Sequence, residues 1–242
     1  HDSRRSGSTQ CSVPVELDVK WRTHLGGRLT SPVVAGDKLF VARIDEHTVY
    51  ALDLQSGKEL WSFTAGGRVD SAPTVWRNRL LFGSADGWVY CLTAEDGRLV
   101  WRFRAAPEDR RMMAFEQVES VWPVSGSVVV YDGVVYCVAG RTAFLDGGIR
   151  LLRLDAKTGR KLSETVIDYG GQEGRQVQVA TPDILSCDGK YVYMKSLRFG
   201  LDGSLEGIPT RNVTEQKGED AHLYSPTNFL DDNWWHRSYW IY

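Results

Sequence analysis

Short apolar runs separated by polar turns make up most of this chain. Four such runs follow one another between residues 29 and 63, and turn-forming residues such as Gly36 and Asp37 lie between them. The runs are rich in Val, Leu, Tyr and Phe, so we predict strands there. These strands lie before Gly36 and at 38–44, 48–54 and 58–63. Consecutive strands joined by such short turns are typical of an antiparallel meander, and four of them fit one propeller blade.

The pattern repeats with a period of forty residues. The segment ALDLQSGKELWSF at 51–63 returns as CLTAEDGRLVWRF at 91–103, with glycine and tryptophan at the same places in both copies. A weaker copy at 153–165 keeps the aspartate and the glycine but has Ser163 where the tryptophan is expected. A period near forty with strands inside each repeat indicates stacked four-stranded units.

These repeats predict an all-β protein, a β-propeller of four-stranded antiparallel blades, with about four blades and two partial ones in residues 13–242. We expect blades at about 25–64, 65–104, 121–168 and 179–200 onward, and a fifth beginning near 222. Residues 104–120 form an insertion, whose MMAFEQVES segment predicts a short helix with Met112, Phe115 and Val118 on one side. Residues 1–12 are expected to form an extended lead-in and 199–221 to lack regular structure.

The repeated residues suit a tight hairpin at the edge of a packed blade. Glycine before the fourth strand supplies the positive φ that such a turn demands, and aspartate can accept hydrogen bonds from the backbone of the turn. The tryptophan four residues after the glycine can fill the wedge between neighbouring blades. We assign these structural roles to Asp53, Gly57, Trp61, Gly97, Trp101, Asp155 and Gly159.

Composition narrows the classes of function. The 242 residues carry a net charge of −2 with a pI near 6.2, so no global field draws the chain to nucleic acid or an anionic membrane. No apolar run approaches the roughly 18 residues that cross a bilayer, so no membrane span is expected. The chain begins at His1 and ends within an apolar run, so we expect a fragment of a longer protein whose targeting sequence is missing.

The four cysteines, Cys11, Cys91, Cys137 and Cys187, are widely spread and lack metal-binding spacing, so no metal site is predicted. Cys91 and Cys137 fall within apolar runs, where buried free thiols are expected and a disulfide is the alternative.

The pattern A-x-D-x-x-[ST]-G-x-x-x-W resembles the repeat of the pyrroloquinoline-quinone, or quinoprotein, β-propeller family. Residues 51–61 match it well, 91–101 match with Thr93 in place of the aspartate, and 153–163 match as far as the glycine. The likeness covers about residues 11–200, and the opening HDSRRSGSTQ looks like the start of exported members. It implies a ring of seven or eight blades and a periplasmic or otherwise exported location, and it is closest to bacterial members that are not dehydrogenases.

Propeller geometry places the long loops on one face. The loops between blades and those between second and third strands meet there, and we call this the long-loop face: 25–31, 45–47, 65–71, 85–87, 104–120 and 141–148. Arg28 and Arg68 occupy matching positions of the repeat on it. Their candidate acidic counterparts are Asp70, Glu116, Glu119 and Asp183. The set forms either a polar funnel for an anionic or sugar-like ligand or a lining of salt bridges.

The tail DDNWWHRSYW at 231–240 is the densest cluster of chemical groups. Its acids, aromatics and bases could make a sugar-stacking or acid–base site, or the aromatics could pack between blades while the acids form a turn. The candidate residues are Asp231, Asp232, Trp234, Trp235, His236 and Arg237.

Three classes of function compete. The first is a non-catalytic binding or scaffold propeller in the cell envelope, which holds a protein partner at the long-loop face. The second is a carbohydrate-binding or carbohydrate-cleaving propeller, with a glycan at that face. The third is a dehydrogenase that uses pyrroloquinoline quinone and Ca²⁺, as the resemblance implies, but the vicinal cysteine pair typical of those enzymes is absent here. We favour the first class, because the repeated residues explain blade geometry rather than catalysis.

Overall fold

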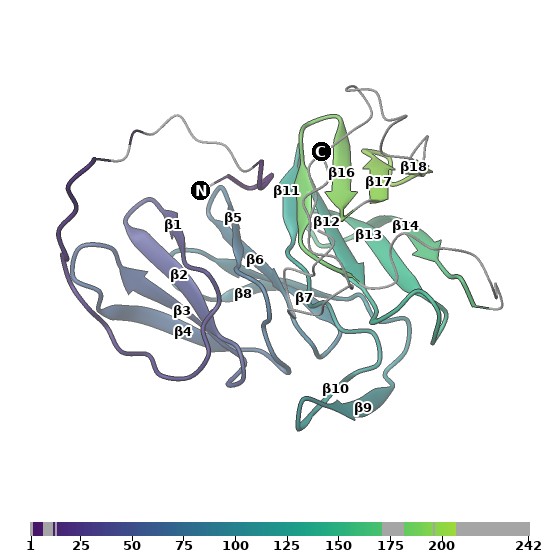
Figure 1. Ribbon diagram of the computed structural model, residues 1–242, viewed down its shortest axis with the longest axis horizontal. Coiled ribbons are helices and arrows are strands. Elements are labelled where there is room, and N and C mark those ends of the chain that lie inside the picture. Colours follow the sequence, from purple (N-terminus) through teal and green to yellow (C-terminus); the bar gives the residue numbers. More distant parts are fainter. Residues whose placement is uncertain (1, 7–11, 13, 171–181, 196, 207–242) are drawn as a thin grey trace.

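The computed structural model describes residues 2–6, 12, 14–170, 182–195 and 197–206, and every regular element in this part of the chain is a strand. Sixteen of the strands form four four-stranded antiparallel sheets, each joined in chain order, which confirms the predicted all-β propeller class (Figure 1). The first sheet contains β1 (Val33–Ala35), β2 (Lys38–Arg43), β3 (Thr48–Asp53) and β4 (Glu59–Thr64). The second contains β5 (Thr74–Trp76), β6 (Arg79–Gly83), β7 (Trp88–Thr93) and β8 (Leu99–Arg104).

The remaining strands form two further sheets and a separate hairpin. The third sheet contains β11 (Val129–Tyr131), β12 (Val134–Ala139), β13 (Ile149–Asp155) and β14 (Lys161–Ile167). The fourth contains β15 (Leu185–Cys187), β16 (Tyr191–Met194), β17 (Leu197–Gly200) and β18 (Leu205–Glu206). The hairpin between the second and third sheets is β9 (Arg111–Ala114) with β10 (Gln117–Ser120).

The first strands of neighbouring sheets lie side by side, as the inner strands of propeller blades do. β11 lies next to both β5 and β15. Hydroxyl groups join these inner strands, because Thr74 Oγ1 donates to the carbonyl of Val128 and Ser127 Oγ donates to the carbonyl of Leu185. Apolar side chains fill the space between successive sheets in three buried clusters. We call β1, β5, β11 and β15 the inner strands.

At the outer edge, a tryptophan of one repeat covers the turn glycine of the next repeat. The ring of Trp61 lies so close to Gly97 that a Cβ on this glycine would sit 2.5 Å from the ring. Trp21 covers Gly57 and Trp101 covers Gly159 in the same way. The indole nitrogens of Trp21, Trp61 and Trp101 donate to the carbonyls of Leu54, Ala94 and Ala156. We call each such contact a tryptophan–glycine latch.

The turn residues behave as the sequence predicts. Gly57, Gly97 and Gly159 have φ values of 69°, 71° and 72°. The Asp53 carboxylate accepts hydrogen bonds from the backbone and side chain of Ser56, and Asp155 does the same with Thr158. These contacts satisfy turn donors that would otherwise have only water as a partner.

The latch changes where the third copy loses its tryptophan. Arg153 Nη1 donates to the carbonyl of Asp202 at 2.9 Å, and its side chain packs against Gly203 beside Ser163. The turn at 202–203 belongs to the fourth sheet, so the prediction that 199–221 lacks regular structure is wrong for 199–206. The hydrophobic pattern did not predict β18, because this strand is short and polar.

The helix predicted in the insertion is also wrong, because MMAFEQVES forms the β9–β10 hairpin. Phe115 and Glu116 both have positive φ, at 48° and 61°, which is the backbone of a two-residue turn that continues the twist of its strands. Met113 then lies opposite Val118, and Met112 opposite Glu119. The spacing of three between Met112, Phe115 and Val118 resembled one face of a helix, but the contacts of β10 with other loops favour the hairpin.

The three described cysteines, Cys91, Cys137 and Cys187, are buried free thiols, as predicted for the first two. Burial raises the pKa of Cys91 and of Cys137 to about 12. Cys11 lies outside the described residues, as do the predicted fifth blade and the 231–240 tail. The structure shows no helix in its described part with the length and apolar character of a membrane span.

Candidate functional site at the long-loop face

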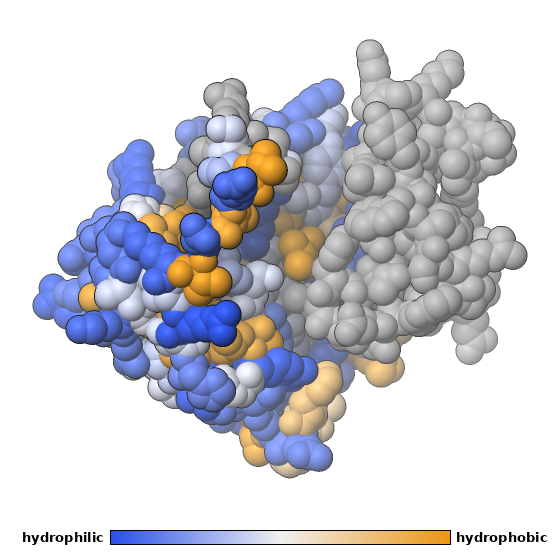
Figure 2. All heavy atoms as spheres, turned by 60° about the vertical axis from the view of Figure 1, so that its left-hand side comes forward, coloured by the Kyte–Doolittle hydropathy of each residue, from blue (hydrophilic) through white to orange (hydrophobic). Residues whose placement is uncertain are grey.

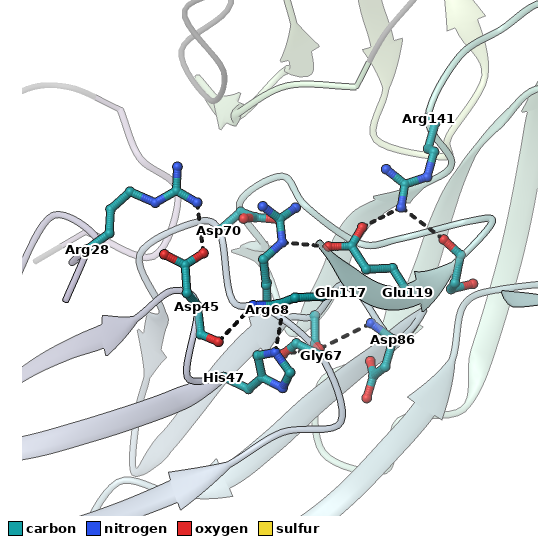
Figure 3. Close-up of polar contacts among 12 residues, drawn as sticks. Arg28, Asp45, His47, Gly67, Arg68, Asp70, Asp86, Gln117, Glu119 and Arg141 are labelled. Carbon is teal, nitrogen blue, oxygen red and sulfur yellow. Dashed lines mark hydrogen bonds and ion pairs between the residues drawn. The ribbon is translucent and has the colours of Figure 1, made fainter. Parts of the chain in front are cut away.

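The insertion hairpin brings three loops of the long-loop face together. Gln117 Nε2 donates to the carbonyl of Asp45, and Gln117 Oε1 lies 2.6 Å from His47 Nε2, in the β2–β3 turn (Figure 3). Two residues further along, Glu119 contacts Arg68 and Arg141, which belong to the loops before the second sheet and after β12. The hairpin is therefore fixed to three successive sheets.

Arg68 is the central cation of this arrangement. Its Nε donates to Glu119 Oε1 at 2.5 Å, and its Nη2 lies 3.3 Å from Asp70 Oδ2. The guanidinium carbon is also 4.0 Å from the centre of the Phe115 ring, at the tip of the hairpin. The Arg68 side chain is only 5% exposed and that of Glu119 is fully buried, so this ion pair is nearly free of solvent screening.

Glu119 serves two guanidinium groups at once. Its second oxygen accepts from Arg141 Nη2, which also donates to the carbonyl of Ser120 at 3.2 Å. Arg141 Nε is buried and has no hydrogen-bond partner among the described residues. One carboxylate cannot accept hydrogen bonds from all the N–H groups of two arginines. Arg68 and Arg141 therefore keep N–H donors for the cavity that both of them line.

The pKa of Asp70 is shifted in opposite directions by its surroundings. Burial raises the pKa of its carboxyl above the ordinary value, the Arg68 guanidinium lowers it, and the nearby Glu119 carboxylate raises it again. The 3.3 Å contact with Arg68 alone would suggest a lowered pKa. Burial outweighs this contact, because the Arg68 charge is shared with Glu119 and the Asp70 side chain is only 12% exposed.

A cavity of about 220 Å³ opens between these loops. The residues of the cluster that line it are Arg28, Arg68, Asp70, Phe115, Ser125 and Arg141. Three arginines, one carboxylate and one aromatic ring thus face a space large enough for one side chain or a small ligand. Arg28 reaches it from an exposed position, where it pairs with Asp45 at 3.0 Å.

The structure brings together part of the predicted set. Arg28, Arg68, Asp70 and Glu119 meet as expected, whereas Glu116 lies at the exposed tip of the hairpin. Asp183 is buried and does not line the cavity, although its neighbour Pro182 does, and its Oδ2 lies 3.9 Å from Lys195 Nζ. The remaining candidates lie outside the described residues: Asp231, Asp232, Trp234, Trp235, His236 and Arg237.

Four residues of the site were not singled out from the sequence: Arg141, Phe115, Gln117 and His47. The signal for Arg141 was its position at the start of a long loop of this face. Phe115 and Gln117 were assigned to a helix, so their contacts with Arg68 and His47 had no basis in the predicted geometry. Only the docking of the hairpin shows which of its side chains face the cavity.

The donor set of this site does not fit the Ca²⁺ ion of a quinone cofactor. Glu119 binds two arginines and Asp70 contacts one, so guanidinium groups occupy the oxygens that a divalent cation would need. Within the described ranges, no three His, Cys, Asp or Glu side chains are grouped as metal ligands. The arrangement is instead suited to an anionic or hydrogen-bond-accepting group presented to Arg28, Arg68 and Arg141.

The meander sheets and the tryptophan–glycine latches together define a β-propeller built from pyrroloquinoline-quinone-like repeats. A family model described as outer membrane protein assembly factor BamB matches residues 3–196, and the chain belongs to this family.

Individual relatives include assembly factors, alcohol dehydrogenases and a tetrathionate hydrolase of Acidithiobacillus ferrooxidans. Outer membrane protein assembly factor BamB of Burkholderia pseudomallei is 28% identical over 151 residues, which cover 62% of this chain and 35% of that protein. A quinohemoprotein alcohol dehydrogenase of Pseudomonas putida is 27% identical over 122 residues, which cover 42% of this chain and 18% of that enzyme. The chain spans between 16% and 35% of the length of these curated relatives.

The solved structure of a quinohemoprotein alcohol dehydrogenase from Pseudomonas putida HK5 matches with a TM-score of 0.54 and 16% identity. The match covers 71% of this chain and 28% of that enzyme. This likeness shows the shared fold.

Proposed function

We propose that this chain is a non-catalytic binding or scaffold module of the bacterial cell envelope, and that it holds a protein partner on its long-loop face. Its membership of the assembly-factor family supports an exported location, because the relatives of that name act at the outer membrane. The chain resembles dehydrogenases in its repeat and its fold. The resemblance does not include a Ca²⁺ site at the long-loop face, because arginines bind the carboxylate of Glu119 there.

The observation that carries this proposal is the apolar surface of the insertion hairpin. Met113 and Val118 lie opposite each other on one face of the hairpin and are 66% and 53% exposed. Phe115 at the tip is 62% exposed. Figure 2 shows apolar surface at the lower end of the molecule, at the height at which the hairpin projects in Figure 1. Exposed apolar side chains gathered on a projecting element mark contact sites for other proteins.

The hairpin is held rigidly although it is small. An isolated two-stranded hairpin is at best marginally stable in water, so its anchors decide its position. Gln117, Glu119 and Phe115 supply these anchors through contacts with three loops. A preorganised apolar hairpin loses little conformational entropy on binding, and methionine adapts its shape to a partner surface.

A site-specific crosslinking experiment tests the proposal in the intact envelope. A photoreactive amino acid replaces Met113 in the full-length protein, and a control places it at Asn78, in the exposed turn between β5 and β6 on the opposite face. We expect one envelope protein to be captured from position 113 and not from position 78. The purified pair should then bind at least about tenfold more weakly after Met113→Ser with Val118→Ser, since two apolar contacts are lost. Equal capture from both faces, or unchanged affinity of the double variant, would refute this function.

The same preparation distinguishes the alternative classes. Added pyrroloquinoline quinone and Ca²⁺ should give neither a bound-cofactor spectrum nor dye-linked alcohol oxidation. A glycan array should retain nothing above background. Turnover in the first assay would establish the dehydrogenase alternative. A retained glycan whose binding is lost in Trp234→Ala would establish the carbohydrate alternative and place its site in the tail.

A further inference from the structure

The inner strands carry a docked segment of the chain itself, apart from the hairpin of the proposed function. Residues 2–6 are docked there, beside β5, β11 and β15 (Figure 1). The sequence predicts an extended lead-in for this stretch, but its residues form a turn instead. The backbone nitrogen of Arg5 donates to the carbonyl of Asp2 at 3.1 Å, and Arg5 has a φ of 52°.

Asp2 fixes this turn from within. One carboxylate oxygen accepts from the backbone nitrogen of Arg4 at 2.9 Å, and the other accepts from that of Ser6 at 3.0 Å. Aspartate is favoured at the first position of such turns for this reason. The sequence Asp-Ser-Arg-Arg-Ser therefore encodes a compact shape through local contacts, independently of the surface on which it lies.

The turn binds the free edges of two inner strands through its backbone. Val130 of β11 donates its N–H to the carbonyl of Ser3 at 2.9 Å and accepts from Ser3 Oγ at 3.0 Å. Cys187 of β15 donates its N–H to the carbonyl of Arg4 at 2.9 Å. An unpaired strand edge offers such donors and acceptors to any peptide of suitable shape.

The Arg5 side chain reaches a third sheet. Its Nη2 donates to the carbonyl of Ala72 at 2.5 Å and to Thr74 Oγ1 at 3.2 Å, just before and within β5. No carboxylate of the described residues pairs with this guanidinium. The site thus holds a cation with neutral oxygens, a charge-assisted contact that a neutral side chain does not replace.

We propose that the edges of β5, β11 and β15 form a binding site for a turn-forming peptide with aspartate at its first position and arginine at its fourth, and that residues 2–6 are its tethered ligand. The backbone bonds to Val130 and Cys187 supply the docking geometry. Asp2 preorganises the turn, and Arg5 supplies selectivity. The ligand contacts three sheets, so its occupancy also joins three blades.

Peptide binding in trans tests this site. Removal of residues 1–6 from the otherwise complete chain should open it, and an acetylated, fluorescent peptide HDSRRSGS should bind the shortened protein but not the full chain. The same peptide with Arg5→Ala should bind at least about tenfold more weakly, because a charge-assisted hydrogen bond is lost. Arg4→Ala removes the same charge and is the matched control. It should weaken binding less than Arg5→Ala does, because Arg4 contacts the strands through its carbonyl and its side chain makes only a part-exposed ion pair with Asp2 at 3.6 Å. No binding to the shortened protein, or equal binding of the Arg5→Ala peptide, would overturn the proposal.

A measurement on the full chain covers the case in which the shortened protein does not fold. The amide hydrogens of Val130 and Cys187 should exchange at least about tenfold faster in the Arg5→Ala protein, because their acceptors are Ser3 and Arg4. The amides of Val135 and Val192, on the neighbouring strands β12 and β16, should keep their protection. Unchanged exchange at Val130 and Cys187 would also overturn the proposal.

Discussion

The outer edge of the blades makes the same contact three times, whereas the long-loop face makes each of its contacts once. Trp21, Trp61 and Trp101 cover successive glycines with nearly the same geometry. On the long-loop face, Arg28 and Arg68 occupy matching positions of the repeat but have different surroundings. Arg28 is 59% exposed and pairs with exposed Asp45, whereas Arg68 is buried beside Glu119.

This difference has a physical origin in the insertion. The hairpin covers the position of Arg68 and supplies Phe115 and Glu119 as its neighbours. Within the described residues, Arg28 forms its ion pair with Asp45 of the β2–β3 turn alone. The repeated residues therefore form the contacts between blades. The insertion that interrupts the repeat gives Arg68 surroundings that Arg28 lacks.

The largest expected effect comes from the buried ion pair. Glu119→Gln should lower the free energy of unfolding by about 3–5 kcal/mol, because Arg141 loses its carboxylate partner and the buried Arg68 keeps only the 3.3 Å contact with Asp70. Glu116→Gln, at the exposed tip of the same hairpin, is the control and should change stability by less than about 0.5 kcal/mol. Urea unfolding measures both. Similar small losses in the two variants would remove the distinction between Arg68 and Arg28.

A somewhat smaller loss is expected at a latch. Gly97→Ala should cost about 2–4 kcal/mol, from positive φ and from overlap with the Trp61 ring. Gly133→Ala is the matched control, because Gly133 has a φ of 75° but no atom near the added Cβ, so it isolates the backbone cost of about 1–2 kcal/mol.

A double-mutant cycle then isolates the ring contact. In a Trp61→Ala background, Gly97→Ala should cost little more than Gly133→Ala, because the overlapping ring is gone. Thermal or urea unfolding of the four proteins gives the coupling. An additive result would show that Trp61 and Gly97 act independently and that the latch is not a packed unit.

The third expected difference is that Asp70 and Asp53 make the folding stability depend on pH in opposite directions. Asp70 has a raised folded pKa, so it favours folding below the unfolded value of 3.8 and loses that contribution as the pH rises through the folded pKa. Asp53 has a lowered folded pKa, chiefly through its hydrogen bonds with Ser56, so its contribution is present above 3.8 and is lost as the pH falls through the folded pKa.

The corresponding variants should therefore diverge with pH. The stability of Asp70→Asn relative to the original protein should rise as the pH increases above about 3.8, and that of Asp53→Asn should fall as the pH increases toward that value. Urea unfolding from about pH 2 to pH 7 measures both slopes. Slopes of the same sign would show that Asp53 at the outer edge and Asp70 on the long-loop face do not differ in the direction of their pKa shifts.

The sequence predicted the repeated part of the molecule best. The alternation of apolar runs and turns gave three sheets, and the spacing of Gly57 and Trp61 gave the turn geometry. The errors in local structure are the helix of the insertion, the missing β17–β18 pairing and the extended lead-in, and all fall where the repeat is absent or weak. Short segments without a repeat have little intrinsic preference, and tertiary contacts decide their conformation.

For the candidate site, the sequence identified the arginines of the matching loops and two of their acidic partners. It did not show which arginine is buried, because burial of Arg68 depends on a hairpin whose fold was not predicted. It also gave no indication that Arg141 shares Glu119, since the two residues are 22 positions apart and on different elements.

The amino-acid sequence by itself determined the blade: strand order, turn positions and the placement of glycine and tryptophan follow from local preference and a regular period. Only the tertiary structure decided the two surfaces proposed to bind partners, because both depend on segments that depart from the period. The β9–β10 hairpin takes its shape from loops of three sheets. Residues 2–6 form their turn locally, but their position depends on the edges of β5, β11 and β15, which are distant in the chain.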